Sequence, residues 1–240
     1  MKVLITRPEA DAAPVAAALE ALGHEAAIEP LLTIVPRPDA AVDLTGVQAL
    51  AFTSANGARV FAGLADRRDL PVFTVGDATA AAAEAAGFAR VESAGGDVTA
   101  LADLIAARPE HGAGAVFHPA AGTVAGDLKG RLEAAGFTVR RAVLYDSEPS
   151  RALSDKTAEA LRQGGLDSVL FFSPRTGRTF VRLLNESRLT DACDRMIAVC
   201  LSQAVAEEIE RLTWRGIMVA AQPTQAALLE VLAALDQPAT

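Results

Sequence analysis

Several polar or small residues lie where an apolar run of the sequence gives way to an Ala-rich amphipathic segment. At such a position, a side chain and the first N–H groups of a following helix can both donate hydrogen bonds to an anion. Ser, Thr, Asp and Asn are also the preferred N-cap residues, so each position could equally serve only to cap a helix. The candidate binding residues are Thr6, Arg7, Thr53, Ser54, Asn56, Gly76, Thr79, Gly122, Ser173, Arg175, Ser202 and Thr224. Their shared chemistry predicts recognition of a small anion through N–H donors, hydroxyl groups and arginine.

Tyr145 is the only tyrosine of the chain and the candidate catalytic residue. It lies in an extended segment, where a phenol could face a ligand and act as a proton donor. Burial with a satisfied hydroxyl is an equally good interpretation, because tyrosine is an ordinary strand residue. His118 could also face a ligand, although a capping or packing role is the stronger expectation, whereas His24 and His111 are expected to be solvated.

Familiar cofactor and metal motifs do not occur in the sequence, which has no GxGxxG, GxxxxGK[ST], GxSxG or HExxH pattern and no Cys/His cluster. We therefore expect neither an organic cofactor nor a metal. The two cysteines, Cys193 and Cys200, form no redox or metal motif and are too few to staple a secreted fold, which favours a reducing cytoplasm. The first residues do not resemble a signal peptide, and no apolar run approaches the roughly 20 residues of a membrane span.

The composition is that of a globular protein with an acidic balance. The chain has 240 residues, of which 51% are hydrophobic and 22% charged, and its formal net charge is −8. This charge disfavours nucleic acid and anionic membranes as partners. Only three of the 22 cationic residues are lysines, so nearly all are arginines, whose planar fork suits carboxylates.

Strand-like runs alternate with amphipathic segments along the chain. The predicted strands cover 3–5, 49–52, 72–75, 115–117, 169–172, 197–199 and 217–219, and the predicted helices cover 9–22, 56–65, 78–86, 123–135, 176–184, 203–212 and 224–235. This order is typical of a parallel sheet covered by helices, so the expected class is α/β. In such folds the ligand lies beyond the carboxyl ends of the strands, which is where the candidate binding residues fall.

The sequence also contains weak internal repeats. Residues 52–61 align with 171–180, 75–80 with 201–206, 97–101 with 224–228, and 19–23 with 132–136. Because the order of these segments is preserved, the chain is interpreted as two similar halves, each a doubly wound, flavodoxin- or Rossmann-like α/β body.

Two extended, proline-closed segments interrupt the alternation, at 31–38 and 142–149. Both are typical of strand-like crossovers between two bodies. They favour a discontinuous first domain made of 1–30 and 150–240, a second domain over 44–140, and linkers over 31–43 and 141–149. The alternative is a simple tandem division of the chain into two domains near residue 112. The sequence pattern alone supports these two domain divisions about equally.

An ordered set of six segments resembles the uroporphyrinogen-III synthase family. They are Val3-Leu4-Ile5-Thr6-Arg7-Pro8, Phe52-Thr53-Ser54-Ala55-Asn56, Val75-Gly76-Asp77-Ala78-Thr79, Gly136 with Val143-Leu144-Tyr145, Phe172-Ser173-Pro174-Arg175, and Pro223-Thr224-Gln225-Ala226-Ala227-Leu228. Each segment is short, but together they span nearly the whole chain in the family's order.

The resemblance implies two α/β domains joined by a two-stranded β-ladder, with the first domain discontinuous. It implies that hydroxymethylbilane, a linear tetrapyrrole with eight carboxylates, is closed to uroporphyrinogen III through a spiro intermediate, with inversion of the last ring and loss of water. It implies no metal or organic cofactor, and it places Tyr145 at the cleft. The sequence departs from the family at Ala204 and near His118, where many members carry arginine.

The sequence is also compatible with two other classes of function. One is a two-lobed protein that closes on a small ligand without catalysis, although no export signal or DNA-binding segment accompanies it. The other is a transferase for sugar nucleotides or S-adenosylmethionine. The sequence has no glycine-rich loop, which argues against such a transferase. For the synthase that the resemblance implies, we expect a monomer acting on a small molecule in the cytoplasm.

Overall fold

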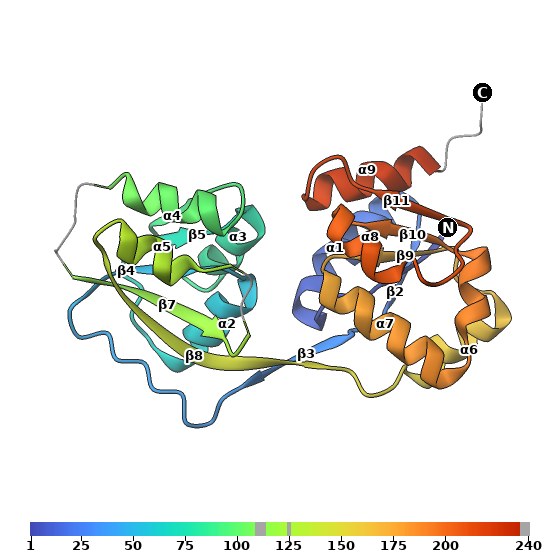
Figure 1. The fold of residues 1–240 in the computed structure, drawn as a ribbon, viewed down its shortest axis with the longest axis horizontal. Coiled ribbons are helices and arrows are strands. Elements are labelled where there is room, and N and C mark those ends of the chain that lie inside the picture. The colour runs from blue at the N-terminus through green and yellow to red at the C-terminus, as the bar shows by residue number, and fades with distance from the viewer. Residues whose placement is uncertain (109–113, 124–125, 236–240) are drawn as a thin grey trace. The chain divides into compact units, whose positions relative to one another are not determined.

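A computed structural model describes residues 1–108, 114–123 and 126–235 of the chain. The chain divides into two compact units, unit 1 (Met1–Thr33 with Glu148–Thr240) and unit 2 (Ile34–Ser147). The chain therefore leaves unit 1 at 33/34 and returns to it at 147/148, positions that fall inside the predicted linkers 31–43 and 141–149. Each unit is a sheet of mainly parallel strands covered by helices, which confirms the expected α/β class (Figure 1).

Unit 1 is built on a five-stranded sheet with strand order β11-β10-β9-β1-β2, in which every pair is parallel. Its strands are β1 (Lys2–Ile5), β2 (Glu25–Ile28), β9 (Ser168–Phe171), β10 (Ile197–Cys200) and β11 (Gly216–Val219). Its helices are α1 (Glu9–Ala21), α6 (Asp155–Gln163), α7 (Pro174–Ser187), the 3-10 helix η1 (Thr190–Arg195), α8 (Gln203–Ile209) and α9 (Gln225–Leu235).

The central strands of unit 1 are buried on both faces. In β1, Leu4 packs into a cluster with residues of α6, α7 and α8, whereas Val3 and Ile5 pack into a second cluster with residues of α1 and α9. Such strands are continuously apolar because helices cover both faces of a parallel sheet. Unit 1 is thus a three-layer α/β/α body.

Unit 2 has a six-stranded sheet with strand order β3-β8-β7-β4-β5-β6. Its strands are β3 (Leu32–Pro36), β4 (Val47–Phe52), β5 (Val72–Thr74), β6 (Val91–Ser93), β7 (Ala115–Ala121) and β8 (Thr138–Pro149). Its helices are α2 (Ala55–Leu64), α3 (Asp77–Ala85), α4 (Val98–Ala106) and α5 (Leu128–Ala134). Residues of α2 and α3 share one core cluster, and residues of α4 and α5 share the other, so this unit also has three layers (Figure 1). The two crossover segments are extended as predicted, since β3 pairs with β8 at the edge of the sheet.

The repeat of 52–61 in 171–180 corresponds to matching local structure. Phe52 and Phe61 meet edge to face with ring centroids 5.8 Å apart in unit 2, and Phe171 and Phe180 meet edge to face at 5.2 Å in unit 1. In each unit the strand that carries the first ring leads through a serine N-cap into the helix that carries the second. The two halves therefore share a strand, cap and helix at the same place in the core.

The structure corrects the helix predicted over 123–135. Strand β7 continues through Pro119 to Ala121, and the following helix begins only at Leu128, where the Asp127 carboxylate accepts a hydrogen bond from the Gly130 N–H. The longer strand follows from its partner, because β8 pairs with β7 in parallel from Ala115 to Ala121. Gly122 therefore follows a strand without opening a helix, contrary to prediction.

Four further elements were not predicted as such: β2, β6, α6 and η1. Strand β2 has an exposed or half-buried side chain at every position, so it lacks the apolar run by which strands were identified. Within the described residues, no helix is both long enough and apolar enough to cross a membrane.

Candidate functional site

The carboxyl ends of the parallel strands gather most of the predicted residues at one edge of each sheet. In unit 2, Thr53 and Ser54 follow β4, Gly76 follows β5 and Gly122 follows β7, and these three strands lie beside one another. In unit 1, the corresponding positions follow β1, β9, β10 and β11, which are also neighbours in their sheet. Each unit thus has a polar edge where ligands of parallel α/β proteins bind.

Ser54 and Tyr145 form the central contact of the unit 2 edge. The Ser54 hydroxyl caps α2 by accepting a hydrogen bond from the Gly57 N–H at 3.1 Å. The same oxygen lies 2.7 Å from the Tyr145 hydroxyl, in a hydrogen bond for which either group can be the donor. Tyr145 comes from β8 and is only 5% exposed, so its ring packs in the core and its hydroxyl lies at the polar edge. Both predicted interpretations of this tyrosine, packing and a hydroxyl available to chemistry, are thus compatible with its position.

Thr53 and His118 form a second contact beside the first. The Thr53 hydroxyl lies 3.2 Å from His118 Nε2, and the histidine, in β7, is 2% exposed. Burial, and to a lesser extent the positive charge of Arg141, lowers the pKa of His118 to about 4. The imidazole is therefore neutral near pH 7 and acts as a hydrogen-bonding group rather than as a cation.

Asn56 in the first turn of α2 accepts a hydrogen bond from Arg59 Nη1 at 3.1 Å. Arg59 is half-buried and was not among the predicted residues, although it lies three positions after Asn56 on the same helix face. At the next strand end, Gly76 is the N-cap residue of α3, where only its backbone groups could contact a ligand. The Thr79 side chain, in the first turn of the same helix, is buried.

Gly122 lies against the segment that carries Tyr145. Its N–H donates to the Tyr145 carbonyl at 3.0 Å, and Arg141 donates to its carbonyl oxygen at 3.3 Å. A Cβ atom at this position would lie 2.3 Å from Asp146 Oδ1. Gly122 thus permits close approach of Asp146, which forms a two-point ion pair with Arg37 at 2.7 and 3.0 Å.

In unit 1, Arg7 is held by three side chains. Its guanidinium lies 3.3 Å from Gln225 Oε1 and 3.8 Å from Asp11 Oδ2, and it lies over the ring of Phe172 at 4.5 Å from the centroid. Thr6, by contrast, is fully buried and donates its hydroxyl to the Leu170 carbonyl at 2.7 Å. Its side chain therefore ties β1 to β9, which argues against direct contact of the Thr6 hydroxyl with a ligand.

The remaining predicted residues of unit 1 lie at the start of helices. Ser173 caps α7 by accepting from the Thr176 N–H at 3.2 Å, and Arg175 lies half-buried in the first turn of that helix. Thr224 accepts from the Ala227 N–H at 3.2 Å at the start of α9. Ser202 is the N-cap residue of α8, but its hydroxyl makes no capping hydrogen bond.

Two histidine predictions have different outcomes. His24 is buried at 4% exposure rather than solvated, because it follows the end of α1 and lies against Met1, whose terminal nitrogen is 3.5 Å from His24 Nδ1. His111 lies outside the described residues. Within the described ranges, no group of three or more His, Cys, Asp or Glu side chains could hold a metal ion.

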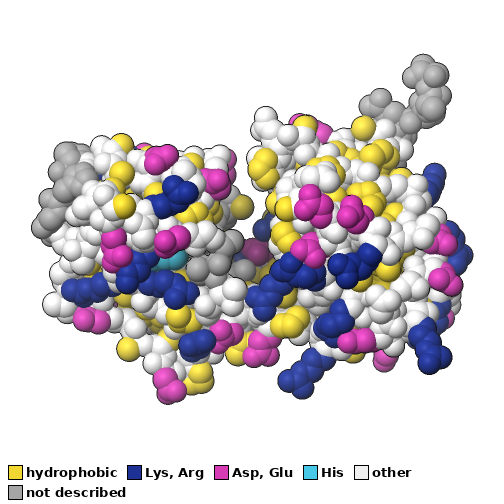
Figure 2. Space-filling view, viewed as in Figure 1, with side chains coloured by type: hydrophobic (Ala, Val, Ile, Leu, Met, Phe, Trp, Pro, Cys, Tyr) yellow, Lys and Arg dark blue, Asp and Glu magenta, His cyan; other side chains and the backbone are white. Residues whose placement is uncertain are grey.

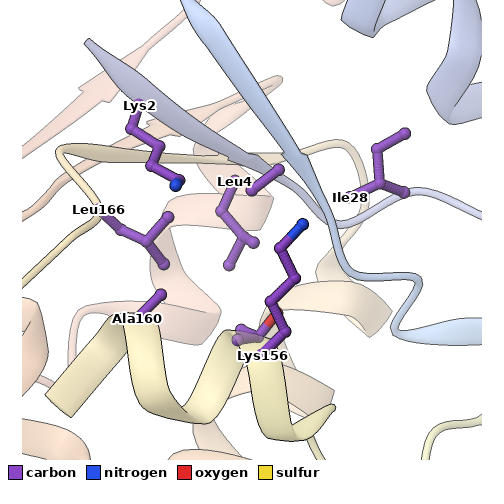
Figure 3. Close-up of a pocket in the computed structure, with 8 residues that line it drawn as sticks. Lys2, Leu4, Ile28, Lys156, Ala160 and Leu166 are labelled. Carbon is purple, nitrogen blue, oxygen red and sulfur yellow. The ribbon is translucent and has the colours of Figure 1, made fainter. Parts of the chain in front are cut away.

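A pocket in unit 1 contains none of the predicted binding residues (Figure 3). It opens between β1, β2 and α6 and is lined by Lys2, Leu4, Ala27, Ile28, Lys156, Thr157, Ala160 and Leu166. The Lys2 ammonium pairs with Glu25 at 2.7 Å, and Thr157 donates to the Glu29 carboxylate at 2.6 Å. Apart from Lys2, Lys156 and Thr157 the lining is apolar, so the pocket lacks the strand-end hydroxyl and N–H donors of the two sheet edges.

Acidic and basic side chains are mixed over the visible face of each unit, with several cations near acidic neighbours (Figure 2). The net charge is −8, so the chain as a whole has no positive field that would attract an anion.

Two α/β/α units, each with hydroxyl, guanidinium and N–H donors at the carboxyl edge of a parallel sheet, define a two-domain protein suited to a polar, anionic small molecule. The family model described as uroporphyrinogen-III synthase HemD matches residues 13–230, and the chain belongs to this family. No curated protein matches the chain significantly.

Solved structures share the two-domain fold. The uroporphyrinogen-III synthetase of Helicobacter pylori is similar at a TM-score of 0.62 and 17% identity, with 98% of this chain and 99% of that chain covered. A mutant uroporphyrinogen III synthase from Thermus thermophilus is similar at a TM-score of 0.51 and 17% identity, with 99% and 100% covered.

Proposed function

We propose that this chain is a lyase that closes hydroxymethylbilane to uroporphyrinogen III, with inversion of the last ring and loss of water. Membership of the uroporphyrinogen-III synthase family carries the proposal. It disfavours both the non-catalytic ligand-binding protein and the transferase. The proposed catalytic site is the polar edge of unit 2, centred on the hydrogen bond between Ser54 and Tyr145. The polar edge of unit 1 is proposed separately as a binding region.

The reaction needs an acid and a means of holding the substrate. The hydroxyl of the substrate leaves as water when it takes a proton, and the azafulvene electrophile remains in its protonated, cationic form with the pyrrole N–H retained. The substituted carbon of the last ring then attacks this electrophile to form the spiro intermediate, which is the step that leads to the type III isomer. We assign the proton to Tyr145, whose hydroxyl lies at the polar edge while its ring is fixed in the core.

Positioning carries most of the selectivity, because the same electrophile closes unaided to the wrong isomer. We propose that carboxylates of the substrate bind to Thr53, Ser54, Asn56, Arg7, Arg175, Ser173, Ser202 and Thr224, and to the backbone at Gly76. Thr6, Thr79 and Gly122 support these groups through packing and backbone contacts, in line with their burial or their place beside Tyr145. Each helix N-terminus stabilises an anion by roughly 0.3–1 kcal/mol.

The test is an isomer analysis. Purified protein is incubated with freshly generated hydroxymethylbilane, the products are oxidised, and the uroporphyrin isomers are resolved. We expect isomer III in excess, at a rate proportional to the protein concentration. Isomer I alone, at the rate seen in buffer, would contradict the proposal.

We further propose that the protein acts as a monomer in the cytoplasm, with no nucleic acid or membrane partner. The net charge of −8 and the two buried, unpaired thiols, Cys193 and Cys200, support this. Sedimentation of the purified protein tests the oligomeric state.

A further inference from the structure

We propose that His118 is a positioning residue that orients the Thr53 hydroxyl so that its proton is directed to a carboxylate of the substrate. This inference rests on the proposed function for its ligand, but not for its geometry. The two residues lie on neighbouring elements of unit 2, since His118 is in β7, Thr53 follows β4, and these strands pair in parallel.

The first step is the protonation state of the imidazole. His118 is 2% exposed, and burial disfavours its charged form, so the ring carries one N–H group near pH 7. Its Nε2 lies 3.2 Å from Thr53 Oγ1, whereas Nδ1 is buried and has no hydrogen-bond partner among the described residues. A buried N–H without an acceptor is rarer in proteins than an acceptor without a donor. The hydrogen is therefore on Nε2, and His118 donates to Thr53.

The second step is the consequence for Thr53. A hydroxyl has one proton to donate and two lone pairs to accept with. Because one lone pair accepts from His118, the proton of the Thr53 hydroxyl is left for another acceptor, and no described protein group accepts it. The half-buried Thr53 side chain lies at the polar edge of the sheet, next to Ser54 and its contact with Tyr145. A substrate carboxylate is the acceptor that completes this chain of hydrogen bonds.

The opposite tautomer would have the opposite effect. If the hydrogen were on Nδ1, Nε2 would accept the Thr53 proton, and the hydroxyl would present only a lone pair to the substrate. A lone pair repels a carboxylate. The tautomer of His118 thus decides whether Thr53 attracts or repels the substrate.

The tautomer can be measured directly in the protein without substrate. Long-range nitrogen-proton correlation spectra near pH 7 distinguish Nε2–H from Nδ1–H, and the His118 signals are assigned by their loss in His118→Gln. We expect the Nε2–H form in the wild type and a shift of the Nε2 signal in Thr53→Val. The Nδ1–H form would overturn the inference. This result does not depend on whether the protein makes isomer III.

The kinetic test is a double-mutant cycle of Thr53→Val and His118→Met. Each single change is expected to raise KM for hydroxymethylbilane about 10-fold, as for loss of one hydrogen bond to a charged group, with kcat changed less than about twofold. The double variant should be no worse than Thr53→Val, because His118 acts through Thr53. The inference would be contradicted if the increases in KM of the two single variants multiplied in the double variant. It would also be contradicted by an unchanged KM in His118→Met.

His118→Gln serves as the matched conservative variant, since it keeps an N–H donor near the position of Nε2. It is expected to recover more than half of the KM effect of His118→Met on a logarithmic scale. If His118→Met does not fold, His118→Gln and the tautomer of the wild type still decide the question. A wild-type protein that produces no isomer III would instead refute the proposed function and leave the tautomer result standing.

Discussion

Tyr145 combines two properties that the sequence presented as alternatives. Its ring packs among the core residues of unit 2, while its hydroxyl meets Ser54 at the polar edge. A phenol held in this way has little freedom to move its ring, so the hydroxyl oxygen has a fixed position. This is what general acid catalysis requires of its donor.

Substitution of Tyr145 by phenylalanine tests that role. The ring and its packing are retained, but the hydroxyl and its hydrogen bond to Ser54 are lost. We expect the rate of isomer III formation to fall about 100-fold, within the usual range for loss of a general acid. Single-turnover kinetics with product isomer analysis measures this rate. A variant that turns over at the wild-type rate would exclude Tyr145 as the acid.

His118 makes the stability of the protein depend on pH. Its pKa falls from 6.5 to about 4 in the folded state, mainly through burial. Below about pH 6.5 the unfolded chain therefore binds a proton that the folded chain does not, and stability is lost as the pH falls towards 4. Between about pH 7 and pH 4.5 this one group lowers the free energy of unfolding by about 2 kcal/mol.

Urea unfolding of the wild type and of His118→Gln at both pH values measures this contribution. The carboxylates are common to both proteins, so the difference between the two pH dependences isolates His118. We expect the variant to lose about 2 kcal/mol less than the wild type on acidification. Equal losses would show that the imidazole takes up its proton in the folded state as readily as in the unfolded chain.

At the scale of elements, Ser54 and Ser173 occupy equivalent places in the two halves. Each caps the helix that follows its strand. The Ser54 hydroxyl also contacts Tyr145 on another strand, whereas the second contact of Ser173, with the Thr176 hydroxyl at 3.2 Å, stays within its own helix. Loss of an N-cap side chain costs about 1 kcal/mol. We therefore expect Ser173→Ala to lower the free energy of unfolding by about 1 kcal/mol and Ser54→Ala to lower it by about 2 kcal/mol.

Chemical denaturation of the two alanine variants compares these costs, with Ser173→Ala as the internal control. Equal destabilisation would mean that the contact between Ser54 and Tyr145 adds nothing to stability.

The sequence was informative where an element has a strong local signal. The central strands and the repeat of 52–61 in 171–180 were identified, and helix capping by the serines was one of two interpretations, because each depends on residues close together in the chain or on a buried apolar run. The contact of Ser54 with Tyr145 could not be predicted from the sequence, because it depends on the order of β8, β7 and β4 in the sheet. The extension of β7 to Ala121 likewise depends on its pairing with the long strand β8.

At the scale of the whole molecule, unit 2 is one continuous segment, whereas unit 1 is made from both ends of the sequence. The two segments of unit 1 meet where the Leu31 carbonyl accepts from the Ser150 N–H at 3.0 Å and the Pro30 carbonyl accepts from the Ser150 hydroxyl at 2.7 Å. The ends left by removal of unit 2 would therefore be close together. A short connection could join them.

We predict that unit 1 folds without unit 2 when Thr33 is joined to Glu148 by roughly four glycine or serine residues. Its two core clusters contain no residue of 34–147, so the deletion removes none of their packing. Circular dichroism and amide NMR spectra should show a cooperatively unfolding α/β domain. A molten or aggregated product, with unit 2 alone well folded, would mean that unit 1 depends on unit 2 for its structure.

The discontinuity of unit 1 also sets the order of events on the ribosome. Strand β1 lies between β2 and β9, so one side of its hydrogen-bonding ladder stays open until β9 is made, roughly 140 residues after β2 ends. At about 5–20 residues per second, this wait is on the order of 10–30 s. During it, Val3, Leu4 and Ile5 lack most of the residues that will bury them, while the whole of unit 2 emerges and can fold. Strand β1 is thus completed only after the whole of unit 2 has been made, and the nascent chain must keep it from aggregating in the meantime.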